Sequence, residues 1–254
     1  MPEAVFEILI VASVVVVAVV LHAFFQRRVD GSQLRKQNDV AGYLFSAVGV
    51  IYAVVLGFVV VVVWEKYDAT GFNVDQESAA VSDLYRAVIE YPQPLRTRIR
   101  AELAEYANDI ITIEWPLMDR RVDVPRDLVL LETLAANVDG FAPKTLGQSN
   151  AQQLATTQLI RLLDARRQRL IQSEPSVPLV LWVALVLGAL AMLFFAFLFG
   201  VENRPTQLVM TAVLAGLIAM LFIVIWEFDN PFTGSVKISA DGWIQVRNHL
   251  AQIP

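Results

Sequence analysis

Four long apolar segments alternate with polar ones along this chain of 254 residues. They cover residues 5–25, 43–62, 178–200 and 208–228, and the second and third contain no charged residue. A helix rises about 1.5 Å per residue, so each segment is long enough to cross the roughly 30 Å hydrocarbon core of a bilayer. The pattern therefore predicts four membrane-spanning helices.

The spacing of the predicted spans indicates how they pack. Only residues 201–206 separate the third span from the fourth, which predicts a hairpin with a tight turn. In the second span, Gly49 and Gly57 lie eight positions apart. They are therefore about 80° from each other on a helix of about 3.6 residues per turn. We expect them to form one broad face of small residues, which a neighbouring helix can approach closely.

The polar segment between the second and third spans, residues 65–176, carries apolar residues at helical spacing. Pro92 and Pro94 separate the first helix from the second, and we expect Trp115-Pro116 to end the second helix. Pro125 begins the third helix, and residues 140–147 separate it from the fourth. The four stripes are Val74, Val81, Leu84 and Val88; Leu95, Ile99, Leu103, Tyr106 and Ile110; Leu128, Leu131, Leu134 and Val138; and Leu154, Leu159, Leu162, Leu163 and Leu170.

These patterns predict an all-α membrane protein with four transmembrane helices and a helical extramembrane domain inserted between the second and third. The predicted divisions are 1–64 for the first two spans, 65–176 for the helical domain, 177–228 for the last two spans and 229–254 for a polar C-terminal tail. Nothing breaks the chain between Trp64 and Gly71, so the second span can continue into the domain. Pro175 and Pro178 mark a kink or a helix restart before the third span.

Composition agrees with a membrane protein and excludes several classes of chemistry. Hydrophobic residues make up 56% of the chain and charged residues 18%, below the usual quarter. With no cysteine, disulfides, thiolate catalysis and cysteine-bound metals are excluded. The net charge of −5 gives no reason to expect nucleic acid as a partner. Glu3 and Glu7 stand where a cleaved signal peptide usually has basic residues, so we expect the first span to be retained.

The charges that flank the spans bear on orientation. Five basic residues lie on one side of the predicted membrane and six on the other, but short loops weigh more than long domains. Together with the acidic N-terminus, this favours an orientation with the N-terminus and the helical domain outside the cytoplasm. The two groups are Arg27, Arg28, Arg35, Lys36 and Arg204, and Lys66, Arg161, Arg166, Arg167, Arg169 and Lys237.

The chain has no recognisable catalytic constellation. Its two histidines, His22 and His249, lie near opposite ends of the sequence, which is a poor pattern for a metal site. There is no phosphate-binding loop, nucleophile elbow or metalloprotease helix motif. We therefore expect no enzyme activity, no cofactor and no metal centre.

Three other places suggest function, and each also has a purely structural interpretation. Asn38 and Asp39, just before the second span, either cap that helix or form a polar collar at the mouth of a pore. Val50, Val54 and Phe58 are spaced by four, so they stack on one face of the second span. Such a stripe serves helix packing or lipid contact, or it forms a hydrophobic constriction where several copies surround an axis.

The third place is the turn after the fourth span, Asp229-Asn230-Pro231-Phe232. The structural interpretation is a helix stop, because proline cannot continue a helix and asparagine tolerates turn conformations. The alternative is an oxygen-rich site for a hard cation such as calcium. The ligand count for a cation is incomplete, since Lys237 comes before the next acidic residue.

Several of these stretches resemble the bestrophin channels. Phe45-Ser46 with Gly49-Val50, Leu56-Gly57-Phe58 and Tyr67-Asp68 resemble the pore helix of bacterial bestrophins, and Asp229-Asn230-Pro231-Phe232 with Gly234 resembles the element after their last span. Across almost the whole chain, the sequence is similar to an uncharacterised bacterial family described as bestrophin-like. The motifs that carry this similarity are Asn38-Asp39-Val40-Ala41-Gly42, Trp64-Glu65, Glu114-Trp115-Pro116, Asp164-Ala165-Arg166-Arg167 and Pro231-Phe232 with Gly234.

The resemblance implies a ring of five subunits whose second spans line a central pore, with a neck at Val50, Val54 and Phe58. It also implies that both termini and the helical domain lie in the cytoplasm, opposite to the orientation that the charges favour. Two departures stand out: residues 59–63 stay apolar after the neck, and non-acidic residues replace the calcium-binding acids of animal bestrophins. We therefore expect no calcium gating. The replacing residues are Thr233, Ser235, Val236 and Lys237.

The sequence thus supports an oligomeric, bestrophin-like ion channel of the bacterial inner membrane, with the lipid bilayer and small inorganic ions as partners. Asp39 or Glu65 would set charge preference at the two pore mouths, and the absence of basic residues within the spans weakly favours cations. The alternative is a non-conducting membrane sensor or scaffold whose helical domain binds a partner.

Overall fold

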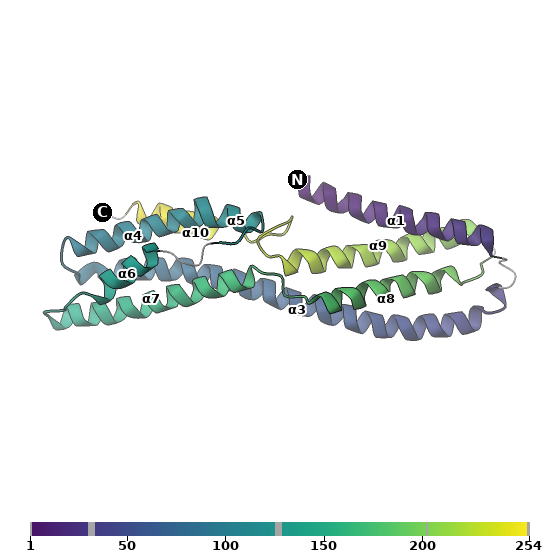
Figure 1. Cartoon of the computed structure of the whole chain (residues 1–254), viewed down its shortest axis with the longest axis horizontal. Coiled ribbons are helices and arrows are strands. Elements are labelled where there is room, and N and C mark those ends of the chain that lie inside the picture. The colour runs from purple at the N-terminus through teal and green to yellow at the C-terminus, as the bar shows by residue number, and fades with distance from the viewer. Residues whose placement is uncertain (1, 30–33, 125–128, 202, 253–254) are drawn as a thin grey trace. The chain divides into compact units, whose positions relative to one another are not determined.

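The computed structural model describes residues 2–29, 34–124, 129–201 and 203–252, and within these ranges every regular element is a helix. Figure 1 shows the helices in chain order. They are α1 (Pro2–Arg28), α3 (Asn38–Ala87), η1 (Val88–Glu90), α4 (Leu95–Asp109), η2 (Ile110–Glu114), α5 (Trp115–Asp119), α6 (Val129–Asp139), α7 (Leu146–Gln172), α8 (Leu179–Phe197), α9 (Arg204–Asp229) and α10 (Asp241–Leu250).

The predicted number of spans is confirmed. In the described chain, four helices are long and apolar enough to cross a membrane: α1, α3, α8 and α9. The continuation of the second span into the polar segment is also confirmed, since α3 runs without a break for 50 residues and passes through Gly71. This protein is therefore an all-α, multi-pass membrane protein.

The chain divides into two compact units. Unit 1 comprises Met1–Glu65 and Ser176–Asp229, and unit 2 comprises Lys66–Pro175 and Asn230–Pro254. In unit 1, α1 lies along α9, as Figure 1 shows, and α8 and α9 form the expected hairpin. Its buried apolar residues come from α3, α8 and α9 and form two clusters: Leu56, Val59, Val63, Leu185 and Ile225; and Ala189, Met192 and Ile218.

The glycines of α3 only partly match the expected small-residue face. A Cβ on Gly49 would lie 3.3 Å from Met192 of α8, so this glycine does permit a close approach. At Gly57 a Cβ would meet nothing within 4 Å, so no described part of the chain uses that face. A much closer approach of α3 to α8 occurs at Gly188 of α8, where a Cβ would collide with the ring of Tyr52 of α3. Small residues at membrane helix contacts allow this kind of approach.

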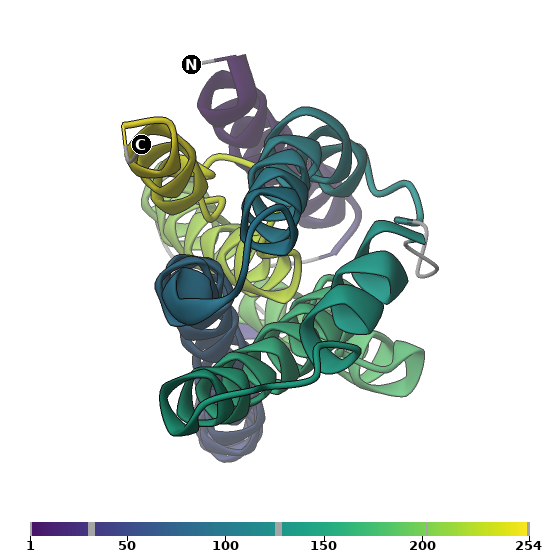
Figure 2. The same ribbon diagram turned by 90° about the vertical axis from the view of Figure 1, so that its left-hand side faces the viewer.

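Unit 2 is a helical bundle with its own apolar core. The second half of α3 contributes Val74, Val81 and Leu84, and the core continues onto α4, α6 and α7 as the periodicity predicts. The C-terminal helix α10, which the sequence analysis did not predict, buries Trp243 in this core against Tyr106, with ring centroids 5.8 Å apart. Figure 2 shows the helices of unit 2 nearly end-on, with α10 beside α4.

One predicted helix boundary is wrong. Trp115-Pro116 does not end the second helix of unit 2, because α4 passes through the π-helix η2 into α5, which continues to Asp119. Pro116 lies in the first turn of α5, where a missing backbone N–H does little harm because the turn at η2 has already changed the hydrogen-bond pattern. Pro125 and Leu128, expected at the next helix start, lie outside the described residues.

Candidate functional site

Helix α3 presents an uncovered apolar face in unit 1. Val50, Val54 and Phe58 expose 65%, 63% and 73% of their surface. Leu56 and Val59, which point the other way, are buried against α8 and α9. The four-residue spacing places the three exposed side chains on one face of the helix, as expected. The chain thus leaves a large apolar stripe of α3 available to lipid or to another subunit.

The residues expected at the two pore mouths have different surroundings. Asn38 uses its whole amide, donating to the carbonyl oxygen of Gly200 and accepting from the N–H of Gly200, both at 2.9 Å. It therefore ties the start of α3 to the turn that follows α8. Asp39 and Glu65 are exposed at the start and the end of the part of α3 that belongs to unit 1. Both positions therefore place an exposed carboxylate side chain at an end of this part of α3.

The turn after the fourth span works as a structural junction. Helix α9 ends at Asp229, one residue before Asn230-Pro231, which agrees with the helix-stop interpretation. The Asp229 carboxylate is buried and accepts from the N–H and the hydroxyl of Ser176 at 2.7 and 2.8 Å, and from the N–H of Val177 at 3.3 Å. Ser176 and Val177 lie just before α8, so Asp229 holds the segment that leads into α8 against the end of α9.

The same hydrogen bonds bear on the alternative of a cation site at this turn. The Asp229 oxygens are occupied by N–H and O–H donors, which a cation would have to displace. Across the described residues, no three His, Cys, Asp or Glu side chains are placed to hold a metal ion. The ring of Phe232 lies in unit 2 instead, edge-on to Trp115 with centroids 5.3 Å apart. Phe232 and Trp115 both belong to motifs of the bestrophin-like resemblance.

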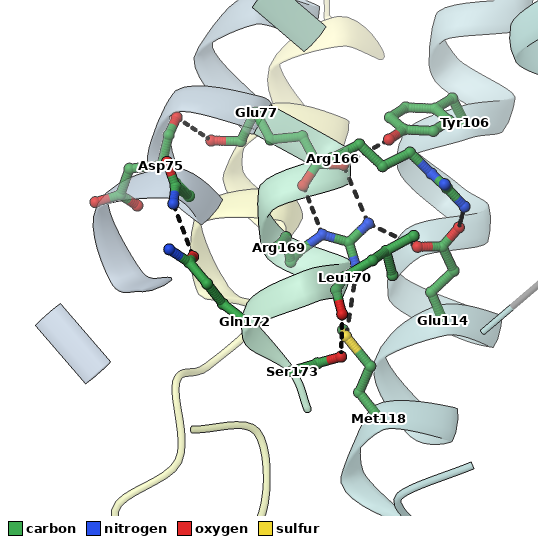
Figure 3. A network of polar contacts seen from close by, with 12 residues as sticks. Asp75, Glu77, Tyr106, Glu114, Met118, Arg166, Arg169, Leu170, Gln172 and Ser173 are labelled. Carbon is green, nitrogen blue, oxygen red and sulfur yellow. Dashed lines mark hydrogen bonds and ion pairs between the residues drawn. The ribbon is translucent and has the colours of Figure 1, made fainter. Parts of the chain in front are cut away.

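Unit 2 contains a buried network of charges, shown in Figure 3. The guanidinium of Arg169 is completely buried and donates to both oxygens of Glu77, at 2.5 and 3.1 Å, and to Glu114 at 2.6 Å. Arg166 donates to the other oxygen of Glu114 at 2.7 Å, and the Tyr106 hydroxyl donates to Glu77 at 2.5 Å. Two cations thus neutralise two carboxylates, and four helical elements, α3, α4, η2 and α7, are joined.

The network keeps its groups in fixed protonation states. Burial by itself lowers the pKa of the Arg169 guanidinium, but the carboxylates of Glu77 and Glu114 outweigh it, and the pKa stays above its ordinary value. Burial, reinforced by the negative charge of Glu77, raises the pKa of Tyr106 well above its ordinary value. Arg169 therefore stays charged and Tyr106 stays a neutral donor across the physiological range. An arrangement this fixed is suited to holding helices together, not to moving protons.

Two of the resemblance motifs meet in this network, and Tyr106 belongs to a stripe that was predicted to be buried. Glu114 comes from Glu114-Trp115-Pro116, and Arg166 comes from Asp164-Ala165-Arg166-Arg167. Glu77 and Arg169 were not singled out from the sequence. A signal for Glu77 did exist, because it lies three residues after Val74 and four before Val81, inside a stripe that was predicted to be buried.

Comparison with known families agrees with this arrangement of spans and bundle. A family model described as Bestrophin-like domain matches residues 12–242, which is most of the chain. The chain belongs to the bestrophin-like family. No curated protein of known function matches the sequence.

Solved structures match this bestrophin-like protein over nearly its whole length. A bacterial bestrophin homologue from Klebsiella pneumoniae, solved as a point mutant, has a TM-score of 0.67 at 12% identity, covering 98% of this chain and 100% of that one. A second point mutant of that homologue gives a TM-score of 0.67 at 13% identity, with 98% of each chain covered. At such low identity the likeness establishes the shared fold alone.

Proposed function

We propose that this protein is an oligomeric ion channel of the bacterial inner membrane, with α3 lining the pore. In this proposal several copies, five by resemblance to the bestrophins, surround an axis onto which the uncovered face of α3 points. Val50, Val54 and Phe58 then form three stacked apolar rings that act as a neck. Such a ring gates ions by excluding water, because an ion that enters a dry constriction must leave part of its hydration shell.

The observation that carries the proposal is the exposure of these three side chains on the same helix that buries its opposite face within unit 1. Gly57 supports it, because its face meets no other part of the described chain and offers room for a neighbouring subunit. Asp39 and Glu65 are exposed at the two ends of this stretch, so carboxylates flank the neck. We therefore propose that the channel prefers cations.

The first test is ion flux from liposomes loaded with potassium chloride. Phe58→Ala removes the largest ring of the neck, so flux should rise at least several-fold over the wild type. Phe6→Ala is the matched control, because Phe6 is similarly exposed, at 64%, on α1, and its loss should leave flux unchanged. A potassium-selective and a chloride-selective ionophore, added separately, then identify the ion that moves. No flux in any variant, with an intact oligomer, would refute conduction and favour the sensor or scaffold.

A second test asks which face of α3 meets water. The chain has no cysteine, so single cysteines can be introduced without a background. Val50→Cys, Val54→Cys and Phe58→Cys should react with a small charged thiol reagent in proteoliposomes. Tyr52→Cys and Val60→Cys should not, because those side chains pack towards the other helices of unit 1. Equal protection at all five positions would mean that the exposed stripe faces lipid, and the pore would not be lined by α3.

A further inference from the structure

Unit 1 contains a cavity of about 300 Å³ that the proposed pore does not use. It lies where α8 ends and α9 begins, with Phe45 of α3 as a further wall. Most of its lining is apolar, including Phe199, Met210 and Leu214. Met210 exposes 64% of its surface, so the cavity borders the exposed surface of α9.

Two polar side chains also line the cavity, Gln207 and Thr211, and both are almost fully buried, at 5% and 2% exposure. Their hydrogen bonds are satisfied within the protein. Gln207 donates to the Phe199 carbonyl oxygen and accepts from the Gln26 amide at 2.8 Å. Thr211 donates to the carbonyl oxygen of Gln207 at 3.1 Å.

The partner of Thr211 completes this set of bonds. His22 of α1 is fully buried, and its Nδ1 lies 2.7 Å from the Thr211 hydroxyl oxygen. Because that hydroxyl donates to Gln207, the Nδ1 of His22 is the donor. Its Nε2 then accepts from Gln26 at 3.3 Å. Every polar group at the cavity wall thus has a partner, and a ligand that occupies the cavity needs no polar atoms there.

The end of unit 1 at which the cavity lies is the basic one. Helix α1 ends there with Arg27 and Arg28, and α9 begins there with Arg204. The bond between Gln26 and Gln207 and the bonds between Asn38 and Gly200 hold these helix ends together. Basic side chains at the end of a span are placed to meet lipid phosphate groups.

We propose that the cavity binds one phospholipid, whose acyl chain enters past Met210 while its phosphate lies among the basic residues at this end. The cavity volume suits part of one acyl chain. A cavity of about 150 Å³ holds benzene, so twice that volume holds on the order of ten carbon atoms. The site is independent of the proposed pore, because its walls come from α8, α9 and Phe45 of α3. None of them belongs to the exposed stripe Val50, Val54 and Phe58.

The test is native mass spectrometry of the purified oligomer in mild detergent, first delipidated and then titrated with phosphatidylglycerol of one defined chain length. Ala196→Phe fills the cavity from α8, because Ala196 is one of its lining residues. Val209→Phe adds the same ring at an exposed position of α9 and serves as the control. We expect the wild type and Val209→Phe to retain the lipid equally. Ala196→Phe should retain it at least tenfold less tightly, the change expected when about two methylenes are excluded.

A second filling variant and a photolabelling measurement complete the test. If Ala196→Phe elutes abnormally in gel filtration, Ala196→Leu replaces it with the same expectation. A phospholipid with a photoreactive group in mid-chain should label the α9 peptide that contains Met210 and Leu214, and the filling variant should lose this label. Equal retention and labelling in all variants would overturn the proposal. Retention of a free fatty acid without the phospholipid would also overturn it, and so would a second protein copy cross-linked at the cavity.

Discussion

Replacing Arg169 by methionine tests whether unit 2 depends on its buried charges. In the wild type, the guanidinium is fully buried and bridges Glu77 and Glu114 with N–O distances of 2.5 and 2.6 Å. After the substitution, Glu114 keeps Arg166, whereas Glu77 loses its partner of opposite charge. Breaking a buried ion pair by removing one partner costs about 3–5 kcal/mol, because the remaining charge stays desolvated. For a domain of this size, that loss lowers the melting temperature by roughly 10–20 °C.

The assay is thermal unfolding in detergent, followed by tryptophan fluorescence, to which the buried Trp115 and Trp243 of unit 2 contribute. The matched control is Arg167→Met on the same helix. The Arg167 side chain is 67% exposed and pairs with Asp164 one turn away at 3.2 Å. An exposed pair of this kind is worth at most about 0.5 kcal/mol, so the control should melt within a few degrees of the wild type.

A double variant separates charge burial from packing. In Arg169→Met combined with Glu77→Leu, no unpaired charge remains at this point, and Glu114 still pairs with Arg166. The double variant should therefore be more stable than Arg169→Met alone, although it differs from the wild type at two positions. The reasoning would be refuted if Arg169→Met melted within about 3 °C of the wild type, or if Arg167→Met lost as much stability.

Three further predictions concern other parts of the fold. Asp229→Ala removes the buried carboxylate that accepts from Ser176 and Val177 and leaves these donors unpaired, so unfolding should cost about 1 kcal/mol less and the melting temperature should fall by a few degrees. Gly188→Leu forces a side chain into the Tyr52 ring and should cost about 1–3 kcal/mol in chemical denaturation, whereas Gly57→Ala meets no other described part of the chain and should leave the folding stability of the single chain unchanged. Burial raises the pKa of Tyr106 in the folded protein, so the unfolded chain loses the hydroxyl proton of Tyr106 at a lower pH than the folded one. The stability that Tyr106 contributes is therefore complete below about pH 10 and is lost at higher pH. Tyr106→Phe should reduce the fall in melting temperature between about pH 9 and 11.

Helix positions in this protein follow from local patterns that the sequence displays directly. Apolar length decides the spans, since a bilayer requires about 20 apolar residues whatever surrounds them. Proline and glycine mark most helix ends in the bundle, as at Pro94 before α4. Pro116 is the exception, because a π-helix precedes it and changes the hydrogen-bond register in a way that no single-residue preference reveals. Helix α10 was missed for a related reason: its only fully buried aromatic, Trp243, finds its place through Tyr106, which is remote in sequence.

The candidate site also has features that local spacing predicts and features that only tertiary contacts determine. The face shared by Val50, Val54 and Phe58 could be predicted from a four-residue spacing alone, and the structure places all three side chains on the uncovered side of α3. Contacts between distant residues could not be predicted in this way. Asp229 was expected to mark a helix end, but its hydrogen bonds to the segment before α8 depend on Ser176, which lies 53 residues earlier in the chain. Such a contact is created by tertiary packing and leaves no periodic trace.

Two clusters of buried polar side chains, one around His22 in unit 1 and one around Arg169 in unit 2, differ in charge, and the surroundings of each cluster explain the difference. The cluster around His22 in unit 1 consists of neutral donors and acceptors, because hydrogen bonds between membrane helices add only about 0.6 kcal/mol each and a charge there is costly. The cluster around Arg169 in unit 2 consists of full charges, whose desolvation is offset only when every partner is in place. Losing one partner should therefore be tolerated near His22 but not near Arg169. A change that weakens unit 2 thus has to be separated from an effect on conduction by measuring folding and flux in the same variant.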